Sequence, residues 1–241
     1  MRVAVVTPYF READGVLRQC LDSVAAQTHP ATHFLVADGF PRDLVRDCIE
    51  DHIVLPRAHG DNGNFARCTG GLSAAVQGFD AIAFLDADNW FTPDHIAVLV
   101  ELQTATQAEL CTASRSIHRL DGSMLFPLDW ESDGENFCDT SCYLFLRPAF
   151  HLLPFWALTP RQTSPITDRL FWAAVLARKV ACAHSARPTV AFRSQYANHY
   201  RRVGEALPPG AKEPEDNLPA IEAWNALTPE ARRRLLAGSV I

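Results

Sequence analysis

The chain alternates short, continuous apolar runs with longer stretches in which apolar residues recur every three or four positions. The apolar runs predict buried strands at Val3–Val6, which is β-branched in type, and at His33–Ala37, Ile53–Leu55, Ala81–Leu85 and Leu110–Ala113. Strands that are apolar at every position are typical of a sheet buried on both faces. The alternation therefore predicts an α/β fold, in which helices cover both faces of a mostly parallel sheet.

Helices are predicted where apolar residues recur at helical spacing, in three stretches at 16–25, 44–49 and 65–76. Thr92-Pro93 predicts a further helix start, with Thr92 as the N-cap and Pro93 at the first helical position. Ser164-Pro165 predicts another start of the same kind. These helices would connect the strands and cover the sheet.

The second half of the chain is less regular. Residues 115–126, with Asp121-Gly122 in the middle, predict a hairpin, and 141–146 predict a strand. Short strands are expected at 180–183 and 190–192. The Pro-rich segment 207–217 predicts a loop, and Thr228-Pro229 starts a last helix that runs through Leu236.

Composition narrows the class of protein. A length of 241 residues fits one large domain with a short appendage, and the net charge of −6 argues against a general nucleic-acid binder. The seven cysteines form no CxxC pair, which favours free thiols in a reducing cytoplasm. The N-terminal apolar run is too short for a signal peptide, and no run is long enough for a transmembrane segment.

Two carboxylates follow the predicted strand 81–85. In parallel sheets ligands bind beyond the carboxyl ends of the strands, so Asp86 and Asp88 lie where a ligand is expected. Two hard carboxylates can hold Mg²⁺ or Mn²⁺ while phosphate oxygens take the remaining positions. Aspartates also favour turns and helix starts, so a structural role is the alternative.

Four segments resemble a GT-A glycosyltransferase of family 2, and together they cover about residues 2–200. They are VAVVTPYFRE, FLVADG, DNGNFARCTGGLSAAVQGFDAIAFLDADN and the stretch from Thr167 to Phe171. The resemblance implies a GT-A-type, Rossmann-like fold with a small antiparallel acceptor-side region and a C-terminal helix. It also implies a hexosyltransferase that uses a nucleoside-diphosphate sugar with Mn²⁺ or Mg²⁺. The chain departs from the family at Cys68 and at Thr167, where an asparagine and an acid are more usual.

The resemblance divides the chain into functional parts. Residues 1–205 would form the glycosyltransferase domain, with 1–114 binding the nucleotide sugar and 115–205 the acceptor. Residues 206–241 would form a Pro-rich linker and the C-terminal helix. The acceptor implied is a glycan, a lipid-linked carrier or a small molecule, not a nucleic acid. Peripheral contact with a membrane is compatible with this arrangement.

The resemblance also assigns a donor site along the strand ends. Its members are Thr7, Pro8, Tyr9, Arg11, Asp38, Arg67, Asp86 and Ala87. Thr7, Pro8 and Tyr9 would line the nucleoside pocket, and Asp38 would accept a hydrogen bond from the base. Arg67 would pair with a phosphate or with Asp38. Strand-ending turns and a solvated arginine are the structural alternatives for these residues.

Catalysis and metal binding are assigned in the same way. Asp168 would be the general base of an inverting transfer, with Asp139 as its rival. Asp86, Asp88 and His199 would be the metal ligands, His199 by comparison with GT-A enzymes that carry a late metal-binding histidine. A helix-start acid and a core histidine are the structural readings of Asp168 and His199.

Three other classes of protein are alternatives to a glycosyltransferase. A nucleotidyltransferase needs a Gly-rich basic loop after its first strand, which 7–12 lacks. A haloacid-dehalogenase-type phosphatase carries its DxD after the first strand, whereas this one follows the fourth. A degenerate transferase that only binds a nucleotide or glycan is the third, and it would not require Asp168 to face the DxD pair.

Overall fold

The computed structural model describes residues 1–46 and 51–238. The strands are β1 Val3–Tyr9, β2 Ala31–Ala37, β3 Asp51–Val54, β4 Ala81–Phe84, β5 Trp90–Phe91, β6 Leu110–His118, β7 Met124–Phe126, β8 Tyr143–Leu146 and β9 Cys182–Arg193. The α-helices are α1 Asp14–Ala25, α2 Asp43–Arg46, α3 Asn64–Val76, α4 His95–Thr106, α5 Phe155–Leu158, α6 Thr167–Ala177, α7 Ala197–Arg202, α8 Leu218–Ala226 and α9 Pro229–Ala237. Short 3₁₀ helices are η1 Thr140–Cys142, η2 Arg147–Leu152, η3 Arg161–Ile166 and η4 Pro214–Asn217.

The strands form one sheet in the order β3-β2-β1-β4-β8-β6-β9-β5, with β7 paired to β6. Strands β3, β2, β1 and β4 run parallel, as their continuous apolar pattern predicts. Strand β8 joins the sheet antiparallel between β4 and β6, and β9 runs parallel to β6. The expected α/β fold, with a mostly parallel part and an antiparallel region in the second half, is confirmed.

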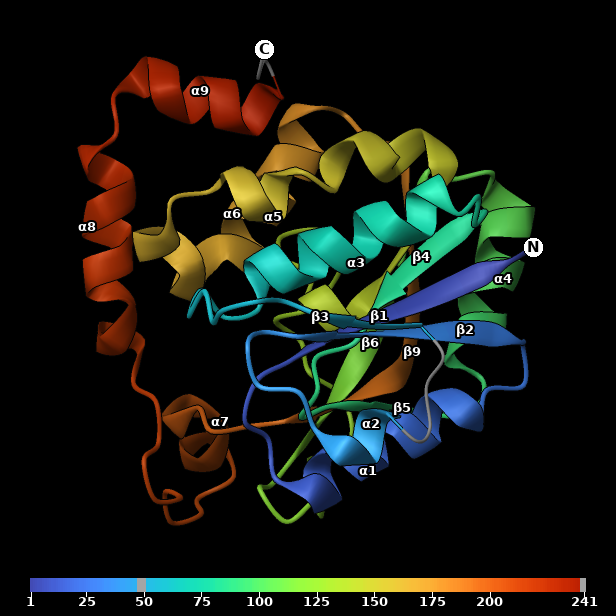
Figure 1. Ribbon diagram of the computed structural model, residues 1–241. Helices are drawn as coiled ribbons and strands as arrows, with labels where there is room; N and C mark the ends of the chain where they lie inside the picture. The colour runs from blue at the N-terminus through green and yellow to red at the C-terminus, as the bar shows by residue number, and fades with distance from the viewer. Residues whose placement is uncertain (47–50, 239–241) are drawn as a thin grey trace.

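Helices cover both faces of the sheet. Figure 1 shows α3, α5 and α6 on one face and α1 and α2 on the other. Helix α4 packs against β6 and β9, and its start meets the end of α1, where Thr28 N donates to Pro93 O at 2.8 Å. The main hydrophobic cluster between these layers includes the aromatic stack of Trp156 on Phe171, with ring centroids 4.4 Å apart.

The last segment of the chain returns along the body of the molecule. Helix α8 packs against η3, and α9 packs against α6, where Arg178 Nε donates to the carbonyl of Leu236 at 2.8 Å. Figure 1 shows these two helices, in red, at the left and top of the view. Within the part of the chain that the structure describes, no helix combines the length and apolar character needed to cross a membrane.

Several predicted elements are confirmed at their ends. The hairpin of β6 and β7 closes where Arg119 N donates to Ser123 O at 2.8 Å, and Gly122 adopts a φ of 87°. Thr228 caps α9 by accepting a hydrogen bond from Ala231 N at 3.1 Å. The predicted helix 44–49 begins as α2, and its last residues, 47–49, lie outside the described ranges.

Other predicted boundaries are wrong. Helix α4 begins at His95, so Asp94 occupies the N-cap position, and Thr92 Oγ1 donates to Asp94 Oδ1 at 2.6 Å. The segment around Pro165 is the 3₁₀ helix η3, so α6 starts only at Thr167. The two short strands expected at 180–183 and 190–192 form the single strand β9. Strand β5 and helix α8 were not predicted.

Candidate active site

The turn after β4 is held from two sides. Ser141 Oγ accepts hydrogen bonds from Asp86 N and from Asn89 Nδ2, each at 3.2 Å. Arg193 Nε donates to the carbonyl of Asp88 at 3.0 Å. Neither Ser141 nor Arg193 was predicted, although both lie at the ends of strands or short helices on the same edge. The turn is thereby fixed, while the side chain of Asp88 remains exposed to solvent.

Asp88 lies in a markedly negative environment. Desolvation and the negative charges of Asp86 and Glu12 together raise the pKa of its carboxyl to about 7, whereas the charge of Lys212 lowers it. A cation bound beside Asp86 and Asp88 would stabilise the ionised form of these carboxylates.

Arg67 connects this turn to helix α3. Its side chain is 4% exposed, and its Nη2 lies 2.5 Å from Asp86 Oδ1. Its Nη1 donates to Asn64 Oδ1 at 3.0 Å, and Asn64 Nδ2 donates to Thr167 Oγ1 at 3.1 Å. The guanidinium also lies over the ring of Trp156. Its ion pair in the structure is with Asp86, its predicted contact with a phosphate stays a prediction, and the chain of contacts leads to the start of α6.

Asp38 at the end of β2 is enclosed by the loop between β3 and α3. Its carboxylate accepts hydrogen bonds from His59 N at 2.9 Å and from His59 Nδ1 at 2.8 Å, and Gly60 N lies 3.3 Å away. The His59 ring stacks on Phe65 with centroids 4.2 Å apart. His59 was not predicted, although its place in a loop after a parallel strand is the signal that could have indicated it.

Thr7 and Tyr9 point into the protein. Thr7 is fully buried, and its Oγ1 lies 2.9 Å from His33 Nε2. Tyr9 packs in a small apolar cluster with Ala87, and its hydroxyl lies 2.8 Å from His52 Nε2. The predicted role of Thr7 and Tyr9 in a nucleoside pocket stays a prediction, because their side chains contact protein in this structure.

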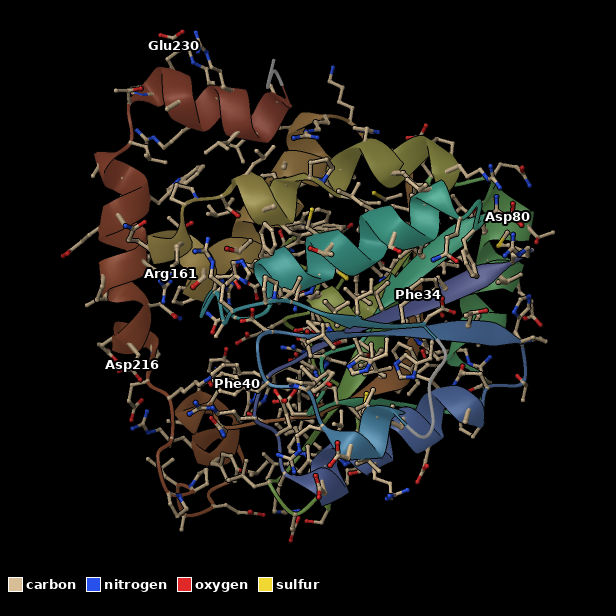
Figure 2. All side chains as sticks on the ribbon, in the orientation of Figure 1. Phe34, Phe40, Asp80, Arg161, Asp216 and Glu230 are labelled. Carbon is tan, nitrogen blue, oxygen red and sulfur yellow. The ribbon has the colours of Figure 1, made fainter. Side chains whose placement is uncertain are left out.

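Pro8 and Arg11 lie on the same edge of the sheet. A Cβ added to Gly63 would meet Pro8 Cβ at 3.0 Å, so the start of α3 lies directly on the proline. Arg11 Cζ lies 4.0 Å from the ring centroid of Phe40. Figure 2 shows Phe40 and Arg161 on the left, where the parallel strands end, and Asp80 on the right, where β4 begins.

Asp168 occupies the first turn of α6. Desolvation raises the pKa of its carboxyl, and the negative charge of Asp86 raises it as well, while Arg169 and Arg115 lower it. Asp86 acts in the same direction on Asp139. The three carboxylates come from distant parts of the chain and share one electrostatic environment.

Asp139 is held in a buried ion-pair network. Arg115 Nη1 lies 2.6 Å from Asp139 Oδ2, and Arg115 Nε lies 2.6 Å from Asp129 Oδ2. Asp139 Oδ1 also accepts a hydrogen bond from Ser141 N at 2.9 Å. Burial raises the pKa of Asp139 to about 6, although the Arg115 charge opposes the rise. Arg115 and Asp129 were not predicted, since nothing in a strand sequence shows that an arginine points inward.

His199 lies in an aromatic environment. Its Nδ1 is 2.7 Å from Ser194 Oγ, and the rings of Phe126 and Phe192 pack edge-on against it. Burial lowers its pKa to about 4. The described residues contain no group of three or more His, Cys, Asp or Glu that could hold a metal ion, so Asp86, Asp88 and His199 form no such group here. Their role as metal ligands stays a prediction.

Comparisons with known proteins agree with this architecture. A family model described as glycosyl transferase family 2 matches residues 4–147. The succinoglycan biosynthesis protein ExoW of Rhizobium meliloti (strain 1021) is 35% identical over 121 residues. These residues make up 47% of this chain and 37% of ExoW, so the match spans little more than a third of that relative.

Solved structures of S. aureus TarS share the fold. The crystal structure of TarS 1–349 in complex with UDP has a TM-score of 0.59 at 13% identity and covers 99% of this chain and 70% of that chain. The complex of TarS 1–349 with UDP-GlcNAc has a TM-score of 0.58 at 15% identity, over 99% and 71% of the two chains. At this identity the likeness concerns the fold, and it confirms the expected GT-A-type architecture.

Proposed function

The chain belongs to glycosyl transferase family 2, and we propose that it transfers a sugar from a nucleoside-diphosphate sugar to an acceptor hydroxyl. The observation that carries the proposal is the convergence of Asp86, Asp139 and Asp168 on one edge of the sheet, where the charge of Asp86 raises the pKa of both others. A module that only binds a nucleotide has no need of Asp168 beside the DxD pair.

The donor would bind along the ends of β1, β2 and β4. UDP and UDP-GlcNAc, which are bound by TarS, favour a uridine nucleotide. Both oxygens of Asp38 already accept hydrogen bonds from His59 and Gly60, so an imide N–H of the base would share or replace one of these contacts. Arg67, fixed beside Asp86, would face the diphosphate.

The residues present fit a divalent cation that is shared with the diphosphate. Asp86 and Asp88 provide two hard carboxylate ligands, and the negative charges of Asp86 and Glu12 around Asp88 favour a bound cation. Mn²⁺ or Mg²⁺ would be held by these two residues, with His199 as a further candidate. When bound, the metal supplies charge neutralisation for the departing diphosphate.

Asp168 is the favoured general base. It would accept the proton of the acceptor hydroxyl while that oxygen attacks the anomeric carbon opposite the diphosphate, which gives inversion in a single displacement. A raised pKa makes its carboxylate a stronger base than an ordinary aspartate. Asp139 fits a positioning role, because Arg115 occupies one of its oxygens and Ser141 N the other.

We place the donor half at residues 1–114, the acceptor half at 115–205 and a C-terminal appendage at 206–241. We expect the acceptor to be a glycan, a lipid-linked carrier or a small molecule, and the role of ExoW in succinoglycan biosynthesis supports a glycan. The described cysteines are free thiols, which supports a reducing, cytoplasmic location.

Thermal unfolding with nucleoside diphosphates tests the donor site. We would compare UDP, GDP, CDP and dTDP, each with Mn²⁺ or with EDTA, on the wild type, on Asp88→Ala and on Asp22→Ala as a control in α1. One diphosphate is expected to stabilise the wild type and Asp22→Ala only with Mn²⁺, by about 2.7 kcal/mol at one hundred times Kd, and to leave Asp88→Ala unshifted. If none of the four diphosphates stabilises the wild type, the proposed donor site is wrong.

A further inference from the structure

Trp130 is a large aromatic side chain that projects into solvent. It follows β7 in the segment 127–136, and it is 58% exposed. The ring of Phe126 lies nearly parallel to it, and Arg202 Cζ lies 3.8 Å from its centroid. A tryptophan ring has a large apolar surface on which a ligand can pack. With Phe126 and Arg202 packed on it, Trp130 still leaves more than half of its surface exposed.

The backbone that carries Trp130 is fixed by buried groups. Asp129 N donates to Arg115 O at 2.8 Å, and Arg115 Nε lies 2.6 Å from Asp129 Oδ2. Asp129 Oδ1 accepts a hydrogen bond from Glu131 N at 3.1 Å, which closes the turn around Trp130. A platform that is already ordered loses little conformational entropy when a ligand binds.

This turn lies beside the carboxylates of the active site. In the next residue, Glu131, Oε2 lies 3.8 Å from Nη2 of Arg169. Arg169 directly follows Asp168. Asn198 Nδ2 donates to Glu131 Oε1 at 3.3 Å. The same Arg115 that holds Asp129 also holds Asp139. Trp130 is thereby linked through its neighbours Asp129 and Glu131 to the residues that contact Asp139 and follow Asp168.

We propose that Trp130 is the platform on which a sugar ring of a saccharide acceptor stacks, with ring hydroxyls directed to Glu131 and Asn198. A pyranose has one face of C–H groups, which packs on an aromatic ring, and a rim of hydroxyls, which need polar partners. Arg202 on the indole keeps the ring in place by a cation–π contact. The inference rests on the proposed function and names the acceptor class of that site.

Saturation-transfer difference NMR tests the platform. The probes are the methyl β-glycosides of glucose, galactose, mannose and N-acetylglucosamine, added to the wild type, Trp130→Ala, Trp130→Phe and Met124→Ala. Met124 is 53% exposed on the same hairpin and serves as the matched apolar control. We expect saturation on the C–H face of at least one glycoside with the wild type. Its Kd should rise about tenfold in Trp130→Ala and stay within about threefold in Trp130→Phe and Met124→Ala.

The outcomes separate this inference from the donor assignment. Each variant is also scanned thermally with UDP and Mn²⁺, so folding and nucleotide binding are measured on the same samples. Glycoside binding that is unchanged in Trp130→Ala, or a wild type that contacts none of the four probes, would overturn the platform even where nucleotide binding is intact. Loss of the nucleotide shift in the wild type would instead count against the donor site.

Discussion

At the scale of single residues, two aspartates of the site differ in what holds them. Asp139 is buried, and both of its oxygens are engaged, one by Arg115 and one by Ser141 N. Asp168 is half-buried at the start of α6, and its Oδ1 accepts the N–H of Arg169 at 2.7 Å. A general base must release its lone pair to the substrate, so the less engaged carboxylate is better suited to the proton transfer.

We therefore expect Asp168→Asn to lower turnover by about 10²–10⁴-fold, because the amide cannot accept the acceptor proton. In the wild type, turnover should decline as the pH falls through the raised pKa of Asp168, since the base acts only when ionised. Asp121→Asn in the exposed hairpin turn is the control. Initial rates of nucleotide release across pH measure both effects. If Asp168→Asn turns over at the wild-type rate, Asp139 would be the general base instead.

Strand-end residues could be predicted from the sequence, but their partners could not. A continuous apolar run ending in Asp86 and Asp88 predicts carboxylates at the ligand edge of a parallel sheet. The contacts that orient them, from Arg67, Ser141 and Arg193, join residues far apart in the chain. Periodicity carries no information about such pairings, which depend on the sheet order and on the return of β9.

At the scale of elements, helix α3 depends on two adjacent glycines to approach the sheet. A Cβ at Gly70 would meet Val6 Cγ1 at 2.5 Å and Val36 Cγ2 at 2.8 Å. One at Gly71 would meet Leu153 Cδ2 at 3.1 Å. The close approach brings Arg67, three residues before Gly70 on the same helix, within reach of Asp86.

We expect Gly70→Ala to destabilise the protein by about 1–3 kcal/mol, because overpacking outweighs the roughly 1 kcal/mol by which alanine favours a helix over glycine. Gly15→Ala in α1 is the matched control. Its Cβ would meet nothing within 4 Å, so it should stabilise by about 0.5–1 kcal/mol. Urea unfolding measures both variants. A neutral or stabilising Gly70→Ala would mean that α3 can move away from the sheet.

Strand β9 was predicted as two strands, and the reason lies in the local sequence. Pro188 and the exposed residues before it break the apolar pattern of β9, so the sequence predicts two strands. The structure accommodates them in one strand by shifting the register against β6 around Ser114. Proline is tolerated at such irregularities because it has no N–H to donate to the ladder. An apolar pattern therefore predicts the buried parts of a strand, but it does not predict that an irregular strand continues between them.

At the scale of the whole molecule, buried histidines and buried carboxylates have opposite effects on stability as the pH falls. Burial lowers the pKa of His33 and His95 to about 3 and that of His199 to about 4, while it raises the pKa values of Asp139 and Asp168. The native histidines stay neutral where the unfolded chain takes up protons near pH 6.5, so stability falls as the pH drops below that value. The carboxylates with raised pKa values oppose this loss.

A single substitution can isolate the histidine contribution. His95 stacks on Phe91 with centroids 3.9 Å apart, its Nδ1 lies 2.7 Å from Thr189 Oγ1, and its buried Nε2 has no hydrogen-bond partner among the described residues. His95→Phe keeps a ring against Phe91 and removes the titration. Between pH 7 and pH 5 its free energy of unfolding should fall by about 2 kcal/mol less than that of the wild type, since each pH unit below 6.5 costs about 1.4 kcal/mol per neutral buried histidine. The lost Thr189 contact changes the free energy of unfolding by the same amount at both pH values, and the carboxylates titrate alike in both proteins. Urea unfolding at the two pH values therefore measures the titration of His95 alone. Equal losses in the two proteins would show that His95 takes up its proton in the native state.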